Sequence, residues 1–266
     1  MLSLVYKYIR KAQEFEMESH IESGIRLENK GHYKEAIAEY DKAAIEDPKK
    51  KEPYILMGNL LEEVGDYLNA LDAFNRAILL DNQDAEVFCS RGDVLATLER
   101  YPEAINDFSQ AISINKEDSY AYYNRGLIYA KTDQSDKALK DFTSAISLDP
   151  NYGSAFNNRG LLYHKLANYQ LAIADFTEAI KVRKGFACSF THRGRVQEAL
   201  GNSDLAIADY TLALEINPTD ATALFFRGAL YISTNRKDEG LKDFELLINT
   251  APKDNHYRSL ALKLKS

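Results

Sequence analysis

The chain has 266 residues, of which 45% are hydrophobic and 27% are charged, with a net charge of −7. These proportions are typical of a folded globular protein and exclude a disordered chain. No apolar stretch approaches the ~20 residues that a membrane-spanning helix needs, which argues against membrane insertion. The N-terminus is apolar first and basic second, the reverse of a secretory signal, and the two cysteines suit a reducing compartment. We therefore expect a cytoplasmic protein.

The charge is distributed unevenly along the chain. Residues 1–118 contain 14 basic and 24 acidic residues, a net of −10, whereas residues 119–266 contain 19 and 16, a net of +3. An acidic N-terminal half repels phosphates, so binding of nucleic acid is disfavoured. The asymmetry either orients a partner along the chain or is ordinary solvated surface.

Residues 1–16 form the first segment in chain order. Leu2, Val5, Ile9 and Ala12 make an apolar stripe at helical spacing. We expect an N-terminal helix that caps the protein or extends from it. The alternative is an exposed amphipathic helix for self-association or for contact with a membrane surface.

Residues 17–254 contain an internal repeat of 34 residues. Aromatic residues dominate positions four and twenty-four of the repeat, and alanine dominates positions twenty and twenty-seven. A glycine occupies position eight every time: Gly24, Gly58, Gly92, Gly126, Gly160, Gly194 and Gly228. The seven repeats are therefore residues 17–50, 51–84, 85–118, 119–152, 153–186, 187–220 and 221–254.

The pattern within each repeat predicts two helices. Apolar residues recur at helical spacing in two stretches, which are separated by a polar turn such as Glu99-Arg100. Two helices and a short turn make an antiparallel hairpin, and stacking of hairpins buries the apolar face that one hairpin leaves exposed. Positions eight and twenty lie at equal distances from the turn, so we expect the glycine to face the alanine and to let the helices approach closely.

These positions resemble the tetratricopeptide repeat family over residues 17–254. The resemblance implies an all-α, right-handed superhelical solenoid of seven antiparallel helix-turn-helix repeats with terminal capping helices. The family favours tryptophan at position four and leucine at position seven. This chain contains no tryptophan, and it mostly has arginine at position seven.

Arginine at position seven occurs together with aspartate at position twenty-three. Both are present in repeats three to seven and both are absent from repeats one and two. The two positions are symmetric about the turn, so we predict one ion pair within each of five repeats: Arg91–Asp107, Arg125–Asp141, Arg159–Asp175, Arg193–Asp209 and Arg227–Asp243. We expect these pairs to specify the fold and not to bind a ligand, with a cost of about 3 kcal/mol for breaking a partly buried one.

Residues 255–266 form the last segment. Tyr257, Leu260, Ala261 and Leu264 follow helical spacing, and Asp254 is the candidate N-cap. We expect a C-terminal capping helix that covers the apolar face of repeat seven.

The resemblance also implies a working surface. In the family, the first helices line a concave inner face through positions two, five, six, nine, twelve and thirteen. Carried over, these positions imply a groove for a peptide or partner at Tyr120, Tyr123, Asn124, Lys131, Asn157, Asn158, His164, Lys165, His192 and Arg195. They imply an acidic end of the groove at Glu52, Glu62, Glu63, Glu86 and Asp93.

Asn124 and Asn158 share position six of adjacent repeats. This is similar to the asparagine ladder with which some family members hold an extended peptide, because an amide offers both a donor and an acceptor. Ordinary solvated asparagines are the alternative.

The sequence shows no phosphate-binding glycine loop and no nucleophile–base constellation, so we expect neither an enzyme nor a cofactor. Cys188, His192 and His164 are too scattered to predict a metal site, and Cys89 lies too far from Cys188 for a disulfide. The favoured function is a non-enzymatic scaffold or adaptor that binds a protein or peptide in the groove. The alternative is an assembly subunit that uses its convex face or its N-terminal helix. A monomer is favoured, although the oligomeric state is open.

Overall fold

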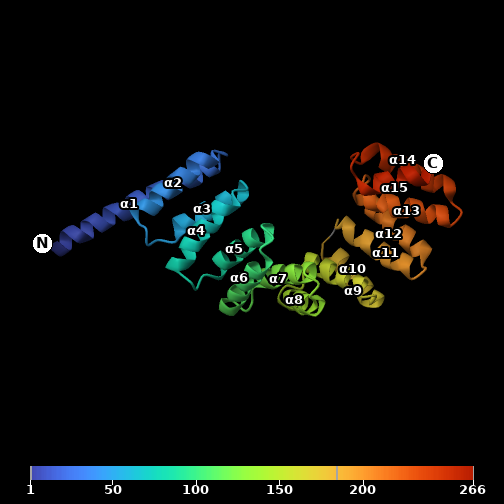
Figure 1. The fold of residues 1–266 in the computed structure, drawn as a ribbon, viewed down its shortest axis with the longest axis horizontal. Helices are drawn as coiled ribbons and strands as arrows, with labels where there is room; N and C mark the ends of the chain where they lie inside the picture. The colour runs from blue at the N-terminus through green and yellow to red at the C-terminus, as the bar shows by residue number, and fades with distance from the viewer. Residues whose placement is uncertain (1, 184, 266) are drawn as a thin grey trace. The chain divides into compact units, whose positions relative to one another are not determined.

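A computed structural model describes residues 2–183 and 185–265, with side chains from residue 15 onward. Over this part of the chain the backbone forms α-helices joined by short turns, and no β-strand (Figure 1). The chain divides into two compact units, residues 1–128 and 129–266, and the division falls within one helix, α7.

The helices alternate as the repeat predicts, two for each 34 residues. The first unit contains α1 (Leu2–Glu28), α2 (Tyr33–Glu46), α3 (Glu52–Glu63), α4 (Tyr67–Leu80), α5 (Ala85–Thr97), α6 (Tyr101–Ile114) and most of α7 (Ser119–Lys131). The second unit contains α8 (Ser135–Leu148), α9 (Gly153–Lys165), α10 (Tyr169–Val182), α11 (Ala187–Ala199), α12 (Ser203–Ile216), α13 (Ala221–Ser233), α14 (Lys237–Thr250) and α15 (His256–Lys265). The all-α architecture of tandem hairpins is confirmed, whereas the superhelical hand stays a prediction.

Helix α1 runs without a break from Leu2 to Glu28, so residues 2–16 share one helix with the start of repeat one. The hairpin partner α2 has 14 residues against the 27 of α1. Since a helix rises about 1.5 Å per residue, α2 is long enough to cover only about half of α1. The apolar stripe expected at Leu2, Val5, Ile9 and Ala12 lies outside the residues whose side chains are described.

The glycine at position eight packs against the aromatic ring at position twenty-four. A β-carbon on Gly160 would lie 2.9 Å from Phe176, and one on Gly194 would lie 2.8 Å from Tyr210. The expected facing of positions eight and twenty is seen in repeat seven, where a β-carbon on Gly240 would lie 2.5 Å from the carbonyl oxygen of Gly228, and the ring is a further neighbour that the sequence pattern did not predict. The glycine at position eight makes room for a fully buried ring, which fills the space between the two helices.

The turn inside each hairpin has one residue in the left-handed conformation at repeat position fifteen. Glycine occupies it at Gly31, Gly65 and Gly201, while the other four repeats use Glu99, Asp133, Ala167 and Asn235, with φ between 57° and 62°. The next residue donates its backbone N–H to a carbonyl five residues earlier, as Asn168 does to Tyr163 at 2.8 Å. This Schellman arrangement closes the first helix and reverses the chain.

Four of the predicted ion pairs are confirmed in the predicted register. Arg91–Asp107, Arg159–Asp175, Arg193–Asp209 and Arg227–Asp243 are each held by two parallel hydrogen bonds of 2.7 to 3.0 Å. Their aspartates are buried, with exposures of 1% to 6%. Arg125 and Asp141 belong to different units, and their pairing stays a prediction.

The same arginines also reach the preceding repeat, which the sequence pattern did not predict. Arg159 Nη1 donates to Thr143 Oγ1 at 3.0 Å, and Thr143 donates in turn to the carbonyl of Leu139 at 2.7 Å. Position twenty-five of the preceding repeat supplies the acceptor every time: Asn75, Ser109, Thr143, Thr177 and Thr211. In repeats three to six the guanidinium also lies 5.6 to 5.7 Å from the ring at position four of its own repeat. We call the arginine, the aspartate and the acceptor together, with the ring where position four is aromatic, a rung.

Helix α15 closes the second unit. Ala261 is buried, the ring of Tyr257 lies 5.2 Å from that of Phe225, and Arg258 Nε donates to the carbonyl of Ile248 at 2.9 Å. The N-cap is Asn255 and not the expected Asp254, because Asn255 Oδ1 accepts from the backbone N–H of Arg258 at 3.1 Å.

Candidate functional site

An open pocket of about 820 Å³ lies within the first unit. Five of its lining residues occupy the predicted inner-face positions two, five, six and nine: Glu86, Cys89, Ser90, Asp93 and Tyr120. Of the predicted site residues, the structure therefore brings Glu86, Asp93 and Tyr120 together around one cavity. We call it the acidic pocket because five carboxylates line it: Asp84, Glu86, Asp93, Glu117 and Asp118.

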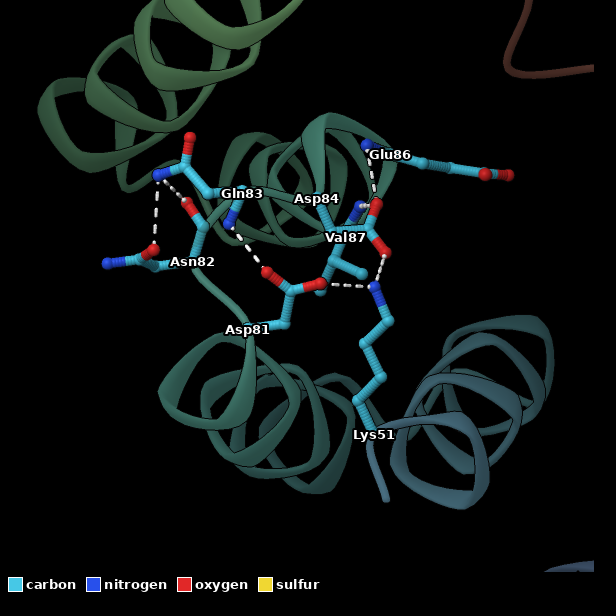
Figure 2. A network of polar contacts seen from close by, with 7 residues as sticks. All are labelled: Lys51, Asp81, Asn82, Gln83, Asp84, Glu86 and Val87. Carbon is cyan, nitrogen blue, oxygen red and sulfur yellow. Dashed lines mark hydrogen bonds and ion pairs between the residues drawn. The ribbon is translucent and has the colours of Figure 1, made fainter. Parts of the chain in front are cut away.

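Among the described residues that line this pocket Lys51 is the only basic one, and its charge is already engaged (Figure 2). Lys51 Nζ lies 2.6 Å from Asp81 and 2.6 Å from Asp84, on either side of the turn between α4 and α5. Hydrogen bonds from the ammonium lower the pKa of Asp81, and the two carboxylates raise the pKa of Lys51. The lysine therefore ties the start of α3 to the end of α4 and to the N-cap of α5, and it leaves the rest of the lining acidic.

Two aspartates of the pocket have a second role as helix caps. Asp84 Oδ1 accepts from the backbone N–H groups of Glu86 and Val87 at the start of α5. Asp118 Oδ1 accepts from the N–H of Ala121 in α7. Both stand at repeat position thirty-four, so the repeat places a carboxylate at the N-terminus of α5 and of α7.

Asp93 and Tyr120 form a hydrogen-bonded pair between neighbouring repeats. Tyr120 Oη donates to Asp93 Oδ2 at 2.7 Å, while the tyrosine remains 46% exposed. Burial raises the pKa of Asp93 to about 6, although the bond from Tyr120 opposes the shift, and the charge of Glu62 adds to it. A cation in the pocket would stabilise the charged form of Asp93.

Cys89 is a buried free thiol in the wall of the pocket. Its Sγ donates to Asp118 Oδ2 at 3.6 Å. Burial and the charge of Asp118 raise the pKa of the thiol, so it stays protonated and unreactive at neutral pH.

The other predicted residues of the first unit do not line the acidic pocket. Glu52 and Glu63 are exposed, and Glu63 accepts from Tyr33 Oη at 3.2 Å. Glu62 is partly buried, and burial raises its pKa. Tyr123 and Asn124 are also partly buried, and Asn124 Nδ2 donates to the carbonyl of Tyr120 at 3.1 Å.

In the second unit, Asn157 lies in the interior. It is only 6% exposed, and its Oδ1 accepts from Ser189 Oγ at 2.9 Å and lies 3.0 Å from His192 Nδ1. The expectation that Asn157 contributes an exposed contact is not met, because its side chain joins α9 to α11. Burial, helped by the charge of Arg195, lowers the pKa of His192 to about 4, so the imidazole is neutral at physiological pH.

The remaining predicted residues of the second unit are nearer to solvent. Lys131 and Lys165 are exposed, and Lys165 Nζ lies 2.6 Å from Asp133. Arg195 lies over the ring of Phe226 at 4.8 Å, and together with burial it lowers the pKa of His164. Asn158 Nδ2 donates to the carbonyl of Ser154 at 3.0 Å, the same bond to the residue four places earlier that Asn124 makes. In both asparagines this local bond occupies one of the two amide N–H groups that an asparagine ladder would offer to a peptide.

The sequence pattern did not predict four charged residues of the acidic pocket: Lys51, Asp84, Glu117 and Asp118. They stand at repeat positions one, thirty-three and thirty-four, outside the positions that line the inner face of the first helices. The repeated aspartate at position thirty-four was the available signal, because an acidic N-cap at the start of a first helix lies beside position two of that helix.

Among the described residues no helix has the length and apolar character needed to cross a membrane. No group of three or more histidine, cysteine, aspartate or glutamate side chains suited to hold a metal ion occurs within residues 15–183 and 185–265.

Three tetratricopeptide repeat family models match the chain, and together they cover more than half of it. One matches residues 119–152 and 153–186, another matches 92–133, and the third matches 52–84 and 189–220. No curated protein is significantly similar to the chain.

Solved structures share the fold. The protein YrrB, described as a tetratricopeptide repeat protein with an unusual peptide-binding site, is 26% identical, with a TM-score of 0.59 over 70% of this chain and 95% of its own. MamA is 26% identical, with a TM-score of 0.58 over 60% of this chain and 93% of its own. A protein from Parabacteroides merdae is 18% identical, and its TM-score of 0.71 over 94% of this chain and 99% of its own shows the common fold.

Proposed function

The chain belongs to the tetratricopeptide repeat family, and we propose that it is an adaptor that binds a basic peptide segment of a partner protein in the acidic pocket. Proteins of this family generally act as scaffolds for protein interactions, and YrrB is described by its peptide-binding site. No catalytic step is proposed.

The observation that carries the proposal is the composition of the pocket. Five carboxylates face one cavity, and the one lysine in the lining already pairs with Asp81 and Asp84. A lysine or arginine side chain of a peptide would offset this negative charge, and the exposed ring of Tyr120 offers contact area at low cost in side-chain entropy.

The predicted residues of the second unit are proposed as a separate contact surface. Lys131, Lys165 and Arg195 make it basic, in contrast to the acidic pocket of the first unit. Acidic groups of a partner are the complementary chemistry for this surface.

The test is binding of fluorescent peptides of two compositions, one carrying four lysines and one carrying four glutamates in the same glycine-serine background. We expect the lysine peptide to bind, with an affinity that falls as salt rises. The triple variant Glu86→Gln/Asp93→Asn/Glu117→Gln should weaken its binding at least tenfold.

The matched control is the triple variant Asp136→Asn/Glu178→Gln/Asp238→Asn, which removes the same charge from second helices outside the pocket. It should leave binding within about twofold. Equal losses in the two variants would show that net charge alone attracts the peptide, and the proposed pocket would then be wrong.

A second candidate function is assembly through α1. The N-terminal half of this helix extends beyond α2 (Figure 1), so it is available to a partner or to a second copy of the chain. Removal of residues 1–14 should lower the mass measured by light scattering if α1 mediates self-association. An unchanged mass would exclude that role.

A further inference from the structure

A second groove of about 720 Å³ lies between α2 and α4 of the first unit. Tyr54, Met57 and Leu61 of α3 line it, together with Ile37, Ala38, Ala44, Ile45, Pro48 and Ala73. Its polar lining consists of Lys34, Asp41, Asn69, Asp72 and Arg76. We call it the repeat-one groove; it shares no lining residue with the acidic pocket.

The equivalent place between repeats two and three is filled by a rung. A cavity of about 370 Å³ remains there, lined by Asn75, Arg91 and Asp107 at repeat positions twenty-five, seven and twenty-three. The Arg91 guanidinium bonds to Asp107 at 2.7 and 2.8 Å and to Asn75 at 2.7 Å, and it lies 5.7 Å from the ring of Phe88. The larger repeat-one groove is thus the place where a guanidinium is missing.

The groove retains the groups that would hold that guanidinium. Asp41 stands at position twenty-five, where a carboxylate is a stronger acceptor than the asparagine, serine or threonine of the later repeats. Tyr54 supplies the ring at position four. Met57 replaces the arginine and Ala73 replaces the aspartate, while Asp72 beside it provides a second carboxylate.

No described residue forms a hydrogen bond or an ion pair with the carboxylate of Asp41 or Asp72. The two basic residues of the lining, Lys34 and Arg76, form no ion pair with these carboxylates, although Arg76 stands one helical turn after Asp72 in α4. Both carboxylates are exposed. The acceptors and the ring of a rung are therefore present, and no described cation is paired with these acceptors.

We propose that the repeat-one groove binds an arginine side chain of a partner protein, which completes the missing rung. The apolar lining suits the aliphatic stem of arginine, and the planar guanidinium can donate to Asp41 and Asp72 while it lies near Tyr54. Arginine is favoured over lysine because its fork can bond two carboxylates at fixed angles, as it does in the chain's own rungs. This proposal is independent of the acidic pocket.

The test is titration of the whole chain with N-acetyl-arginine methylamide, followed by nuclear magnetic resonance of backbone amides and of the Met57 methyl group. The analogues with lysine, citrulline and leucine serve as probes of charge, shape and apolar character. We expect resonances of Met57 and of α2–α4 to move with arginine, at least fivefold more weakly with lysine, and not with citrulline or leucine. An equal response to citrulline or leucine would overturn the proposal.

Two variants locate the response. Met57→Arg/Ala73→Asp gives repeat two the residues of a rung and should abolish the arginine response of the α2–α4 backbone amides while its circular dichroism stays native. Asp41→Asn keeps the groove open and should weaken the response at least fivefold.

Glu86→Gln/Asp93→Asn alters only the acidic pocket and should leave the arginine response at Met57 unchanged. Persistence of the arginine response of the α2–α4 backbone amides in Met57→Arg/Ala73→Asp would contradict the proposal. Because the readout is at Met57, failure of peptide binding in the acidic pocket would not affect it.

Discussion

At the scale of single residues, the rung is the interaction that most clearly separates repeats three to seven from repeats one and two. Each confirmed arginine has two bonds to a buried aspartate and one to the preceding repeat. A buried carboxylate that loses its partner is costly because it cannot be resolvated in place. The strength of a rung should therefore appear as coupling between its members.

We predict a coupling of about 2 kcal/mol between Arg159 and Asp175. The substitutions are Arg159→Met, Asp175→Ala and the double variant, which reproduces the residues that repeat two has naturally at positions seven and twenty-three. The measurement is the free energy of unfolding in urea for the wild type and the three variants.

The control cycle uses Arg100 and Glu103, which form an exposed pair at 2.7 Å at the start of α6. Its coupling should stay below about 0.5 kcal/mol, since exposed pairs are screened by water. Equal coupling in the two cycles would mean that burial does not strengthen the rung.

The sequence predicts the arginine and the aspartate of each rung but not the acceptor at position twenty-five. Arginine and aspartate stand out because they vary together across repeats, so their pairing could be read from spacing alone. Position twenty-five is asparagine, serine or threonine, ordinary residues for the surface of a helix. Its role becomes visible only when neighbouring repeats are stacked, because the bond from Arg159 to Thr143 crosses between hairpins.

We predict that binding of the lysine peptide weakens as pH falls from 7 to 5. The pKa of Asp93 is raised to about 6 by burial, so the pocket loses this charge across that interval. Fluorescence titrations at several pH values measure the effect, and Asp93→Asn should flatten the pH dependence. An unaltered pH profile in Asp93→Asn would show that another group is responsible.

The raised pKa of Asp93 affects folding stability in the opposite direction to peptide binding, because stability falls as pH rises. The pKa of folded Asp93 is above its usual value, so its contribution to stability is fully present below about pH 4 and is lost as pH rises through about 6. In the absence of peptide, Asp93→Asn should therefore raise stability at pH 7 relative to the wild type.

At the scale of secondary-structure elements, the turn between the helices of each hairpin is set by one residue with positive φ. Ala167 has φ of 57° and Gly201 has φ of 77° at the same repeat position. A β-carbon in this region costs about 1 kcal/mol, whereas glycine adopts it freely. The sequence shows where the turn lies, but the tolerance for alanine there depends on the Schellman hydrogen bonds that hold it.

We predict that Ala167→Gly raises the free energy of unfolding by about 1 kcal/mol and that Gly201→Ala lowers it by a similar amount. Both turns are in the second unit and both lead into 14-residue helices, α10 and α12, so each variant is the matched control of the other. Thermal unfolding followed by circular dichroism gives the two shifts. Shifts of the same sign would contradict the conclusion that positive φ at this repeat position makes a β-carbon costly.

At the scale of the whole molecule, stability in a tandem-repeat protein is approximately a sum of terms for each hairpin and for each interface with its neighbour. A rung contributes to both terms, because one arginine holds its own hairpin and the preceding one. The interface between repeats one and two has no rung, and the sequence alone indicates this from Met57 and Ala73. What the sequence does not indicate is the consequence, an open groove in place of an arginine.

We predict that hydrogen exchange within the first unit is at least tenfold faster in α2, which no described arginine bridges to the next repeat, than in α5 and α6. Local opening requires loss of the interface between repeats, and only the later interface is bridged by Arg91. The control is Met57→Arg/Ala73→Asp, which adds a rung without changing the distance of α2 from the chain end. This variant should slow exchange in α2 and leave α5 and α6 unchanged. If exchange in α2 remains as fast as in the wild type, fraying from the N-terminus and not the missing rung sets the local stability of this helix.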